Sequence, residues 1–273
     1  FYPLGTVIGK SFATDGWLDL APLTTIWREV YFRRALWFTF WQATASTALT
    51  LALGLPAAFV FARFRFPGKQ LLQALTTIPF VLPALVVAAA FMALLGPRGW
   101  LNELLMAAFG LPRPPIRLQQ TIWLILIAHA FYNTSVVIRL VGNFWGHLDR
   151  KLMDAARLLG ANRLRVLWEI TLPLLLPAIT AAGLLVVLFC FTSFGVILIL
   201  GGPSFATLEV EIYRLSVTLF RLPEAAALSL VQMALTFVVM AVYARVQARA
   251  AAPLNLRPAE EVALPPITLR QKL

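Results

Sequence analysis

Residues 35–62 read ALWFTFWQATASTALTLALGLPAAFVFA, which is 28 residues without a charged side chain. A helix needs about 20 apolar residues to cross the hydrocarbon core of a bilayer. Amphipathic helices of soluble proteins instead carry polar residues along one face. This stretch therefore predicts a helix that spans a membrane.

Similar runs recur along the chain. We predict further spans over 71–95, 121–141, 174–200 and 225–246, each built on at least 18 consecutive uncharged residues. The apolar stretch at 1–9 is interpreted as the remnant of a first span that begins upstream. The predicted fold is an all-α membrane protein, a polytopic bundle of about six transmembrane helices. We expect one transmembrane domain over 1–247.

The composition agrees with lipid surroundings. Apolar residues make up 60% of the chain and charged residues 13%, with a mean hydropathy of +0.81, whereas soluble domains are about half apolar and a quarter charged. A net charge of +11 could indicate a nucleic-acid partner. However, the basic residues form short clusters between uncharged runs rather than one basic face. We therefore expect membrane lipid, and no nucleic acid, as a partner.

The connections between the spans carry unequal charge. Taken alternately, one set holds 14 Lys and Arg and 5 acids, and the other holds 9 Lys and Arg and 7 acids. The net charges are +9 and +2. Because cytoplasmic loops are enriched in Lys and Arg, the first set, which includes 63–69 and 142–172, is predicted to face the cytoplasm.

The sequence offers little catalytic chemistry. Cys190 is the single cysteine, so no disulfide framework forms within the chain, and neither Cys190 nor His129 has a second metal ligand at useful spacing. Gly68-Lys69 is followed by Gln70, so the Ser or Thr of a Walker A motif is missing. We predict no catalytic residue, metal or cofactor, and no ATPase activity in this chain. The alternatives are a membrane-embedded enzyme, although the predicted spans contain no Asp or Glu, or a passive channel.

The predicted cytoplasmic connection from 142 to 172 contains two short helical segments. Asp154–Leu159 favours helix, with its acid in the first turn, and Gly160 is suited to the positive φ of a helix C-terminus. Asn162 can cap a second helix over 163–169, and Pro173 can open the next span from its first turn. The result is a helix-turn-helix against the inner face of the membrane. Its apolar side chains need a partner, lipid or the protein's own helices to cover them: Leu158, Leu159, Leu164, Val166, Leu167 and Trp168.

The spacing in this connection resembles the EAA loop of binding-protein-dependent ABC importer permeases. The family pattern is EAA, three residues, G, nine residues and I-x-L-P. This chain matches it at every position but the first, where Asp replaces Glu: Asp154, Ala155, Ala156, Gly160, Ile170, Leu172 and Pro173. Stretches 39–58, 77–88 and 191–213 are also similar to the family. The last of them looks like the branch that transports ferric iron or thiamine.

The resemblance implies the partners and the mechanism. The loop would dock on an ABC ATP-binding subunit dimer, and a periplasmic substrate-binding protein would deliver the solute to a permease in the bacterial inner membrane. A second permease half would be needed, fused or separate. We favour a fused half, with residues 248–273 as a cytoplasmic tail or linker to it.

Polar side chains inside the predicted spans are candidates for the translocation path, because polar groups are costly against lipid. The strongest candidates are Gln42, His129, Asn133 and Gln232. Hydrogen bonding between helices is the alternative role for each of them.

Overall fold

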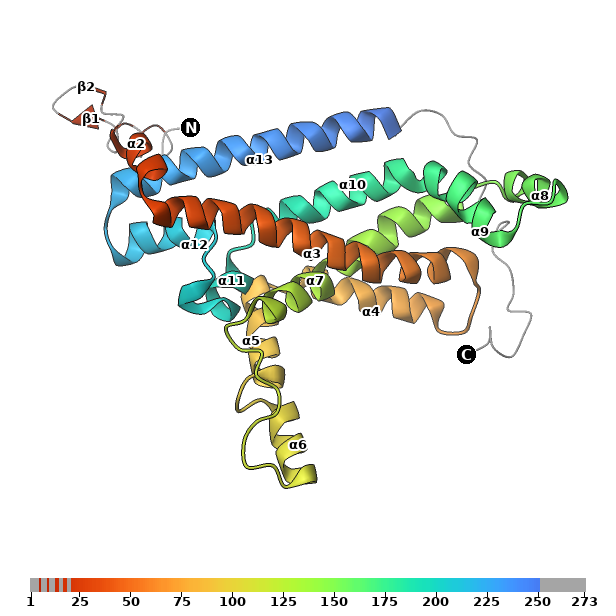
Figure 1. The fold of residues 1–273 in the computed structure, drawn as a ribbon, viewed down its shortest axis with the longest axis horizontal. Helices are drawn as coiled ribbons and strands as arrows, with labels where there is room; N and C mark the ends of the chain where they lie inside the picture. Colours follow the sequence, from red (N-terminus) through yellow and green to blue (C-terminus); the bar gives the residue numbers. More distant parts are fainter. Residues whose placement is uncertain (1–4, 6–8, 10–12, 15–16, 19–20, 251–273) are drawn as a thin grey trace. The chain divides into compact units, whose positions relative to one another are not determined.

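The computed structural model describes residues 5, 9, 13–14, 17–18 and 21–250. The predicted remnant of a span at 1–9 therefore falls mostly outside the described residues, as does the predicted tail from residue 251 onward. Figure 1 shows the elements in chain order. They are β1 (Ala13–Thr14), β2 (Trp17–Leu18), α2 (Ala21–Arg28), α3 (Val30–Arg63), α4 (Lys69–Val81), α5 (Ala84–Leu95), α6 (Trp100–Phe109), α7 (Ile122–Gly146), α8 (Arg150–Leu158), α9 (Arg163–Val166), η1 (Leu167–Thr171), α10 (Leu172–Phe191), α11 (Gly195–Leu200), η2 (Gly202–Ser204), α12 (Leu208–Tyr213), η3 (Arg214–Thr218) and α13 (Leu222–Ala250).

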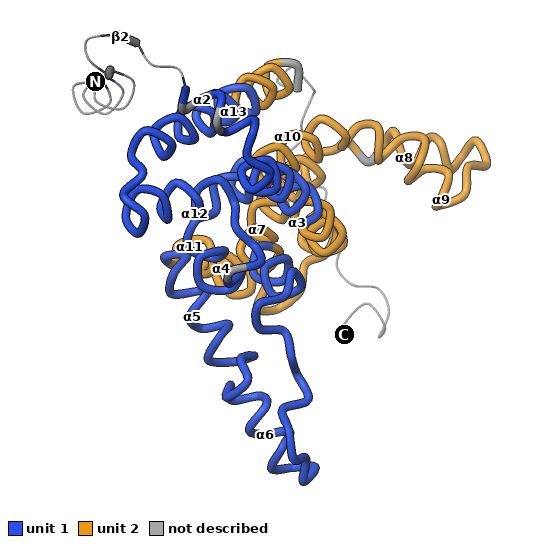
Figure 2. The backbone as a smooth tube through the Cα atoms, turned by 60° about the vertical axis from the view of Figure 1, so that its left-hand side comes forward, with its two compact units in different colours: residues 1–45, 83–129, 188–239 blue, residues 46–82, 130–187, 240–273 orange. Residues whose placement is uncertain are grey.

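The chain divides into two compact units, coloured separately in Figure 2. Unit 1 comprises residues 1–45, 83–129 and 188–239, and unit 2 comprises 46–82, 130–187 and 240–273. The long helices α3, α7, α10 and α13 each contribute to both units. Each unit is thus assembled from segments that are far apart in sequence.

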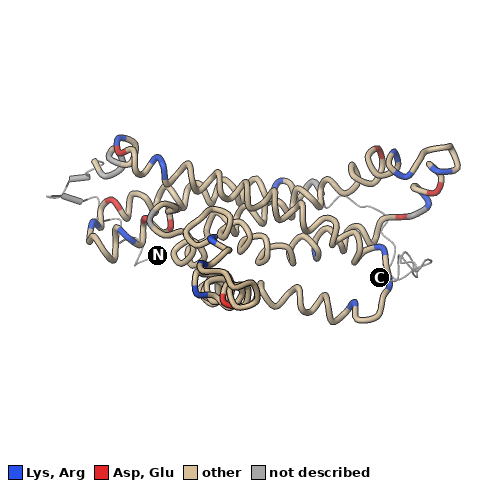
Figure 3. Tube along the Cα trace, turned by 60° about the horizontal axis from the view of Figure 1, so that its bottom comes forward, with Lys and Arg blue, Asp and Glu red and all other residues tan. Residues whose placement is uncertain are grey.

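Five helical segments of the described chain are long and apolar enough to cross a membrane: Val30–Arg63, Ala84–Phe109, Ile122–Gly146, Arg163–Phe191 and Leu222–Ala248. The all-α membrane fold is confirmed. The predicted spans at 35–62 and 225–246 lie within α3 and α13, and the span at 121–141 lies within α7 except for its first residue, Thr121. Lys, Arg, Asp and Glu gather toward helix ends and connections, which leaves long uncharged stretches between them (Figure 3).

The predicted span at 71–95 is not one helix. It is divided into α4 and α5 at Leu82, whose backbone is extended, with a φ of −69° and a ψ of 142°. Pro83 follows, and a proline disfavours helical geometry in the residue before it. The membrane-length segment here is Ala84–Phe109, with a turn between α5 and α6, so it differs from the predicted 71–95.

The predicted span at 174–200 is also interrupted. Helix α10 ends at Phe191, and α11 begins only at Gly195. A Cβ atom on Gly195 would lie 3.2 Å from the side chain and backbone nitrogen of Leu85, so α11 packs tightly on α5 at this point. The helical segment of membrane length here is Arg163–Phe191, whose first residues form α9 and η1 ahead of α10.

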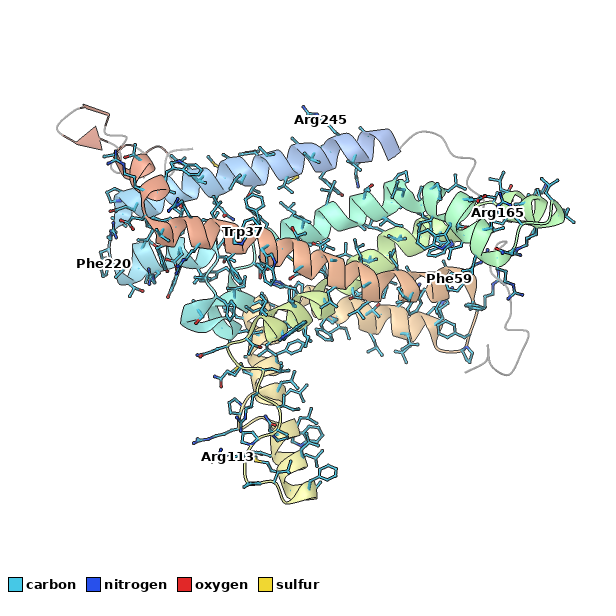
Figure 4. The ribbon with its side chains drawn as sticks, in the orientation of Figure 1. Trp37, Phe59, Arg113, Arg165, Phe220 and Arg245 are labelled. Carbon is cyan, nitrogen blue, oxygen red and sulfur yellow. The ribbon has the colours of Figure 1, made fainter. Side chains whose placement is uncertain are left out.

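Apolar contacts hold each unit together. In unit 1, one buried cluster joins α2, α3, α12 and α13, and another joins α5, α7 and α11. In unit 2, a Cβ atom on Gly54 would approach the Cβ of Val137 to 2.7 Å, so the close approach of α3 and α7 requires glycine there. Many large apolar side chains remain exposed, including Trp37 and Phe220 (Figure 4), as expected of surfaces that face lipid or protein.

Candidate functional site

The predicted helix-turn-helix forms a hairpin over residues 149–171 in unit 2, hereafter the hairpin. The Asp149 carboxylate accepts a hydrogen bond of 3.0 Å from the backbone N–H of Lys151 and so caps α8. At the other end Gly160 has a φ of +88°, and its N–H bonds to the carbonyl of Arg157 while that of Ala161 bonds to Ala156. This pair of bonds is the Schellman motif, which satisfies the last carbonyls of a helix.

The second arm of the hairpin runs directly into the membrane-length helix. Asn162 caps α9 by accepting a 2.8 Å hydrogen bond from the N–H of Arg165, as predicted. The predicted helix at 163–169 passes into the π-helical turn η1 and then into α10. Pro173 has no N–H to donate to the carbonyl of Glu169, four residues earlier. The helix is wider in this π-helical turn, which holds about one residue more than an α-helical turn, and it continues into α10 without a break.

One detail of the predicted hairpin was wrong. Asp154 is the fifth residue of α8, not a first-turn residue, because the helix already begins at Arg150 behind its Asp149 cap. Asp154 pairs with Arg157 at 3.4 Å, and both side chains are well exposed. Exposed ion pairs of this kind contribute little to stability, so Asp154 remains available for another contact.

The two sides of the hairpin differ sharply. Met153, Val166 and Thr171 are buried, and the Met153 sulfur lies 3.6 Å from Thr171 Oγ1 and 4.0 Å from Arg63 Nη2 at the end of α3. The opposite side presents large apolar side chains to solvent, with the exposed fractions Leu158 90%, Leu159 90%, Leu164 67% and Trp168 65%. Arg165 projects from the same hairpin (Figure 4).

The residues of the family pattern occupy both arms of this hairpin. Ala156 and Ile170 line a hollow of about 260 Å³ between the arms, together with Leu159 and Val166. Ala155, like Asp154, is exposed on α8, while Leu172 and the exposed Pro173 begin α10. The fold thus brings the two halves of the pattern together on one surface feature.

Two of the candidate path residues form hydrogen bonds with residues at or beside the gap between α10 and α11 in unit 1. Gln42 is fully buried, and its Nε2 donates a 2.8 Å hydrogen bond to the carbonyl of Cys190. His129 is 2% exposed, with its Nε2 2.8 Å from Ser193 Oγ. Because a helix end leaves carbonyls without partners, the bond from Gln42 satisfies one carbonyl near the end of α10, while His129 contacts a side chain in the gap.

The other two candidates are buried elsewhere. Asn133 lies in unit 2 and is 2% exposed. Gln232, in unit 1, is 7% exposed, and its Nε2 lies 3.4 Å from Glu209 Oε1. The printed contacts of Gln42, His129 and Gln232 favour hydrogen bonding between segments of the chain for these three residues. The role of all four candidates in a path stays a prediction.

The sequence analysis did not single out a buried carboxylate in unit 1. Glu211 is 1% exposed, accepts a hydrogen bond from the Tyr31 hydroxyl, and lies 3.2 Å from Arg214 Nε. Burial raises the pKa of Glu211, whereas Tyr31 and Arg214 act in the opposite direction. The signal in the sequence was a pair of acids, Glu209 and Glu211, alternating with apolar residues in the stretch LEVEIY.

Helices of membrane length define this molecule as a polytopic membrane protein, and an exposed helical hairpin precedes one of those helices. The family model described as "Binding-protein-dependent transport system inner membrane component" matches residues 50–252, and the chain belongs to that family. It is thus a permease component of an ABC importer and a multi-pass inner-membrane protein.

Relatives with assigned roles include two groups of transport proteins. The putative 2-aminoethylphosphonate transport system permease protein PhnU of Salmonella typhi is 26% identical over 244 residues, covering 89% of this chain and 84% of PhnU. The thiamine transport system permease protein ThiP of Brucella abortus is 33% identical over 214 residues, covering 78% of this chain and 39% of ThiP. The chain thus spans well under half the length of ThiP.

Solved structures support the fold. A bacterial ABC transporter involved in the import of the acidic polysaccharide alginate aligns with a TM-score of 0.71 at 18% identity, over 91% of this chain and 90% of that one. The MetNI methionine ABC transporter, in inward-facing conformations, aligns with a TM-score of 0.56 at 15% identity, over 84% of this chain and 99% of that one.

Proposed function

We propose that the hairpin is the docking site for a separate ABC ATP-binding subunit dimer. The observation that carries this proposal is the exposure of four large apolar side chains on its outer side: Leu158, Leu159, Leu164 and Trp168. Apolar surface of this extent, rimmed by charged residues, is typical of a site of protein association. The flanking charges of Arg157, Arg165 and Glu169 are exposed and suited to setting the orientation of a partner.

The way the hairpin joins the membrane helices suits it to transmit force. Its second arm continues through η1 into α10 without a loop, and Met153 on its first arm contacts Arg63 at the end of α3. A displacement of the docked hairpin would therefore move α10 directly. Closure of the nucleotide-binding dimer on ATP would then switch a permease cavity between inward-facing and outward-facing states by alternating access.

The solute would come from a periplasmic substrate-binding protein and pass through a cavity shared with a second permease half, either fused to this chain or separate. We propose ferric iron or thiamine as the solute. Similarity to the thiamine permease ThiP of Brucella abortus supports thiamine. Similarity to the permease PhnU of Salmonella typhi supports 2-aminoethylphosphonate as a third candidate. Uptake of each radiolabelled solute into cells with and without the gene for this chain distinguishes them.

The docking proposal is tested by making the exposed leucines polar. Leu158→Ser/Leu159→Ser should insert in the membrane at wild-type levels but lose copurification of the ATP-binding subunit and lose uptake. The matched control is Leu104→Ser/Leu111→Ser, which changes two exposed leucines, one on α6 and one in the connection that follows it, and should retain both.

Two results would overturn the proposal. Uptake and copurification that survive the change at Leu158 and Leu159 would exclude the hairpin as the docking site. Turnover of a lipid or peptide by the purified chain without ATP would favour a membrane-embedded enzyme instead, and solute flux without ATP would favour a passive channel.

A further inference from the structure

A second feature of unit 2 lies where α3, α4 and α7 come together. A pocket of about 1000 Å³ opens between the C-terminal end of α3, the first turns of α4 and the last turns of α7. All of its lining residues belong to segments 61–77 and 138–146 of unit 2, so it is complete within that unit. It is hereafter the basic pocket. Pockets that bind small molecules range up to about this volume.

Three cations line the basic pocket: Arg65, Lys69 and Arg139. No Asp or Glu is among its described lining residues, and within the described part of the chain none of the three cations forms an ion pair. Lys69 donates a 3.1 Å hydrogen bond to the carbonyl of Phe64, which holds its ammonium near Arg65. Burial, and then the neighbouring charge of Arg65, lower the pKa of Lys69. Among the described residues of the chain, no acidic side chain forms an ion pair with the positive charges of this pocket.

The rest of the lining is divided between two kinds of group. Amides and hydroxyls are supplied by Gln70, Gln73, Thr77 and Asn143. Apolar surface is supplied by Phe61, Phe66, Leu71 and Ile138. A ligand that fits this lining carries a compact negative charge with several acceptor oxygens and has an apolar portion attached to it.

We propose that the basic pocket binds a phosphate-type anion, and that the headgroup of an anionic phospholipid is its source. Arg and Lys bind phosphate oxygens through charge-assisted hydrogen bonds, and basic pockets between membrane helices bind lipid headgroups. The pocket lies beside the α3–α4 connection, at the end of unit 2 that the distribution of Lys and Arg predicts to be cytoplasmic, where phosphate groups of the inner leaflet lie. Free phosphate, or a soluble phosphonate, shares the same chemistry, and the apolar lining favours the lipid.

The test uses the purified chain in lipid nanodiscs. The variant is Arg65→Gln/Lys69→Gln/Arg139→Gln, and its control is Arg98→Gln/Arg113→Gln/Arg117→Gln, which removes the same charge from the segment between α5 and α7. Retention of phosphatidylglycerol after transfer to detergent is counted by native mass spectrometry, beside phosphatidylcholine. Each nearby Lys or Arg contributes about 1 kcal/mol to binding anionic lipid. The variant should therefore bind phosphatidylglycerol on the order of a hundredfold more weakly, while the control binds it like wild type.

A second arm separates the two sources of the anion. Wild-type chain in phosphatidylcholine nanodiscs is titrated with inorganic phosphate, with thermal unfolding as the readout. A shift that the variant lacks supports a soluble anion, and preference for phosphatidylglycerol without such a shift supports the lipid. Equal behaviour of wild type and variant in both arms would overturn the proposal. Neither arm involves uptake, so failure here leaves the function proposed for the hairpin untouched.

Discussion

The hairpin at 149–171 and the connection between α5 and α7 at 96–121 are built from similar parts but held in different ways. Each contains a short helix that ends at a glycine with positive φ, Gly160 at +88° and Gly110 at +62°. Each also exposes large apolar residues, among them Trp168 on the hairpin and Trp100 on α6. They differ in what fixes their shape.

The connection between α5 and α7 is fastened through one buried side chain. Asn102 on α6 is fully buried, donates to the carbonyls of Gly96 and Ile116 at 2.8 Å, and accepts from the N–H of Ile116 at 2.9 Å. The two helices of the hairpin are capped by the side chains of Asp149 and Asn162, each of which accepts a hydrogen bond from a backbone N–H nearby in sequence. A locally capped hairpin keeps its form while one whole side stays open, which is what a docking element requires.

The largest effect is expected from removing the Asn102 side chain, whose hydrogen bonds hold the connection between α5 and α7. Asn102→Ala removes three hydrogen bonds and leaves the buried carbonyl of Gly96 and both backbone groups of Ile116 without that partner. We expect a destabilisation of about 3 kcal/mol. The thermal unfolding of the purified chain in detergent measures it, and limited proteolysis near residue 116 should show the loop released.

This prediction sharpens the comparison because the loss is structural. The ATP-binding subunit should still copurify with the fraction of Asn102→Ala that folds. An unfolding temperature equal to that of wild type would mean that the amide does not hold the loop.

The second expected effect compares the two glycines. Gly160→Leu and Gly110→Leu place an L-residue in the same left-handed conformation, and no heavy atom lies within 4 Å of the new Cβ at either position. Each variant should lose about 1–2 kcal/mol of stability through backbone strain. Only Gly160→Leu also alters the docking surface, so only that variant should lose uptake, by about tenfold or more.

The pair is therefore its own control, because strain is matched and location differs. Uptake assays at equal membrane levels of the two proteins provide the measurement. If both variants transport equally well, or both fail equally, the turn at Gly160 has no particular part in coupling to the ATP-binding subunit.

The sequence was most informative where the determinants are local. The uncharged runs predicted the membrane helices, and the positive φ at Gly160 and the cap at Asn162 followed from residue types that favour those positions. The predicted start of this helix at Asp154 is four residues too late, because α8 begins at Arg150, directly after the cap at Asp149. Residue preferences therefore predict the presence of a helix more securely than the residue at which it begins.

The sequence was least informative where two distant segments meet. The gap between α10 and α11 lies inside a continuous uncharged run, and its contacts come from Gln42, which bonds to the Cys190 carbonyl, and from His129, which contacts Ser193. Burial of Glu211 depends on Tyr31, which is 180 residues away in sequence. The break at Leu82–Pro83 could have been predicted, since a proline restricts the residue before it, and hydropathy alone concealed it.

The smallest expected effect concerns the caps of the hairpin itself. Asn162→Ala removes the acceptor of the N–H of Arg165 and should cost about 1 kcal/mol. Asn162→Gly is the matched variant, because glycine at a cap costs only a few tenths of that amount, about 0.3 kcal/mol. Thermal unfolding ranks the two, and ATP-stimulated uptake is measured on the same samples.

The order of these two variants tests the view that local caps keep the open hairpin in shape. If the caps act in this way, uptake should fall with the loss of the cap, more in Asn162→Ala than in Asn162→Gly, while the Asn102→Ala variant loses stability without this graded effect. An Asn162→Ala chain that matches wild type in both assays would mean that the docked partner, rather than the hairpin's own caps, holds α9 in place. The hairpin would then be ordered by binding, and its resemblance to the connection at 96–121 would be limited to its glycine turn.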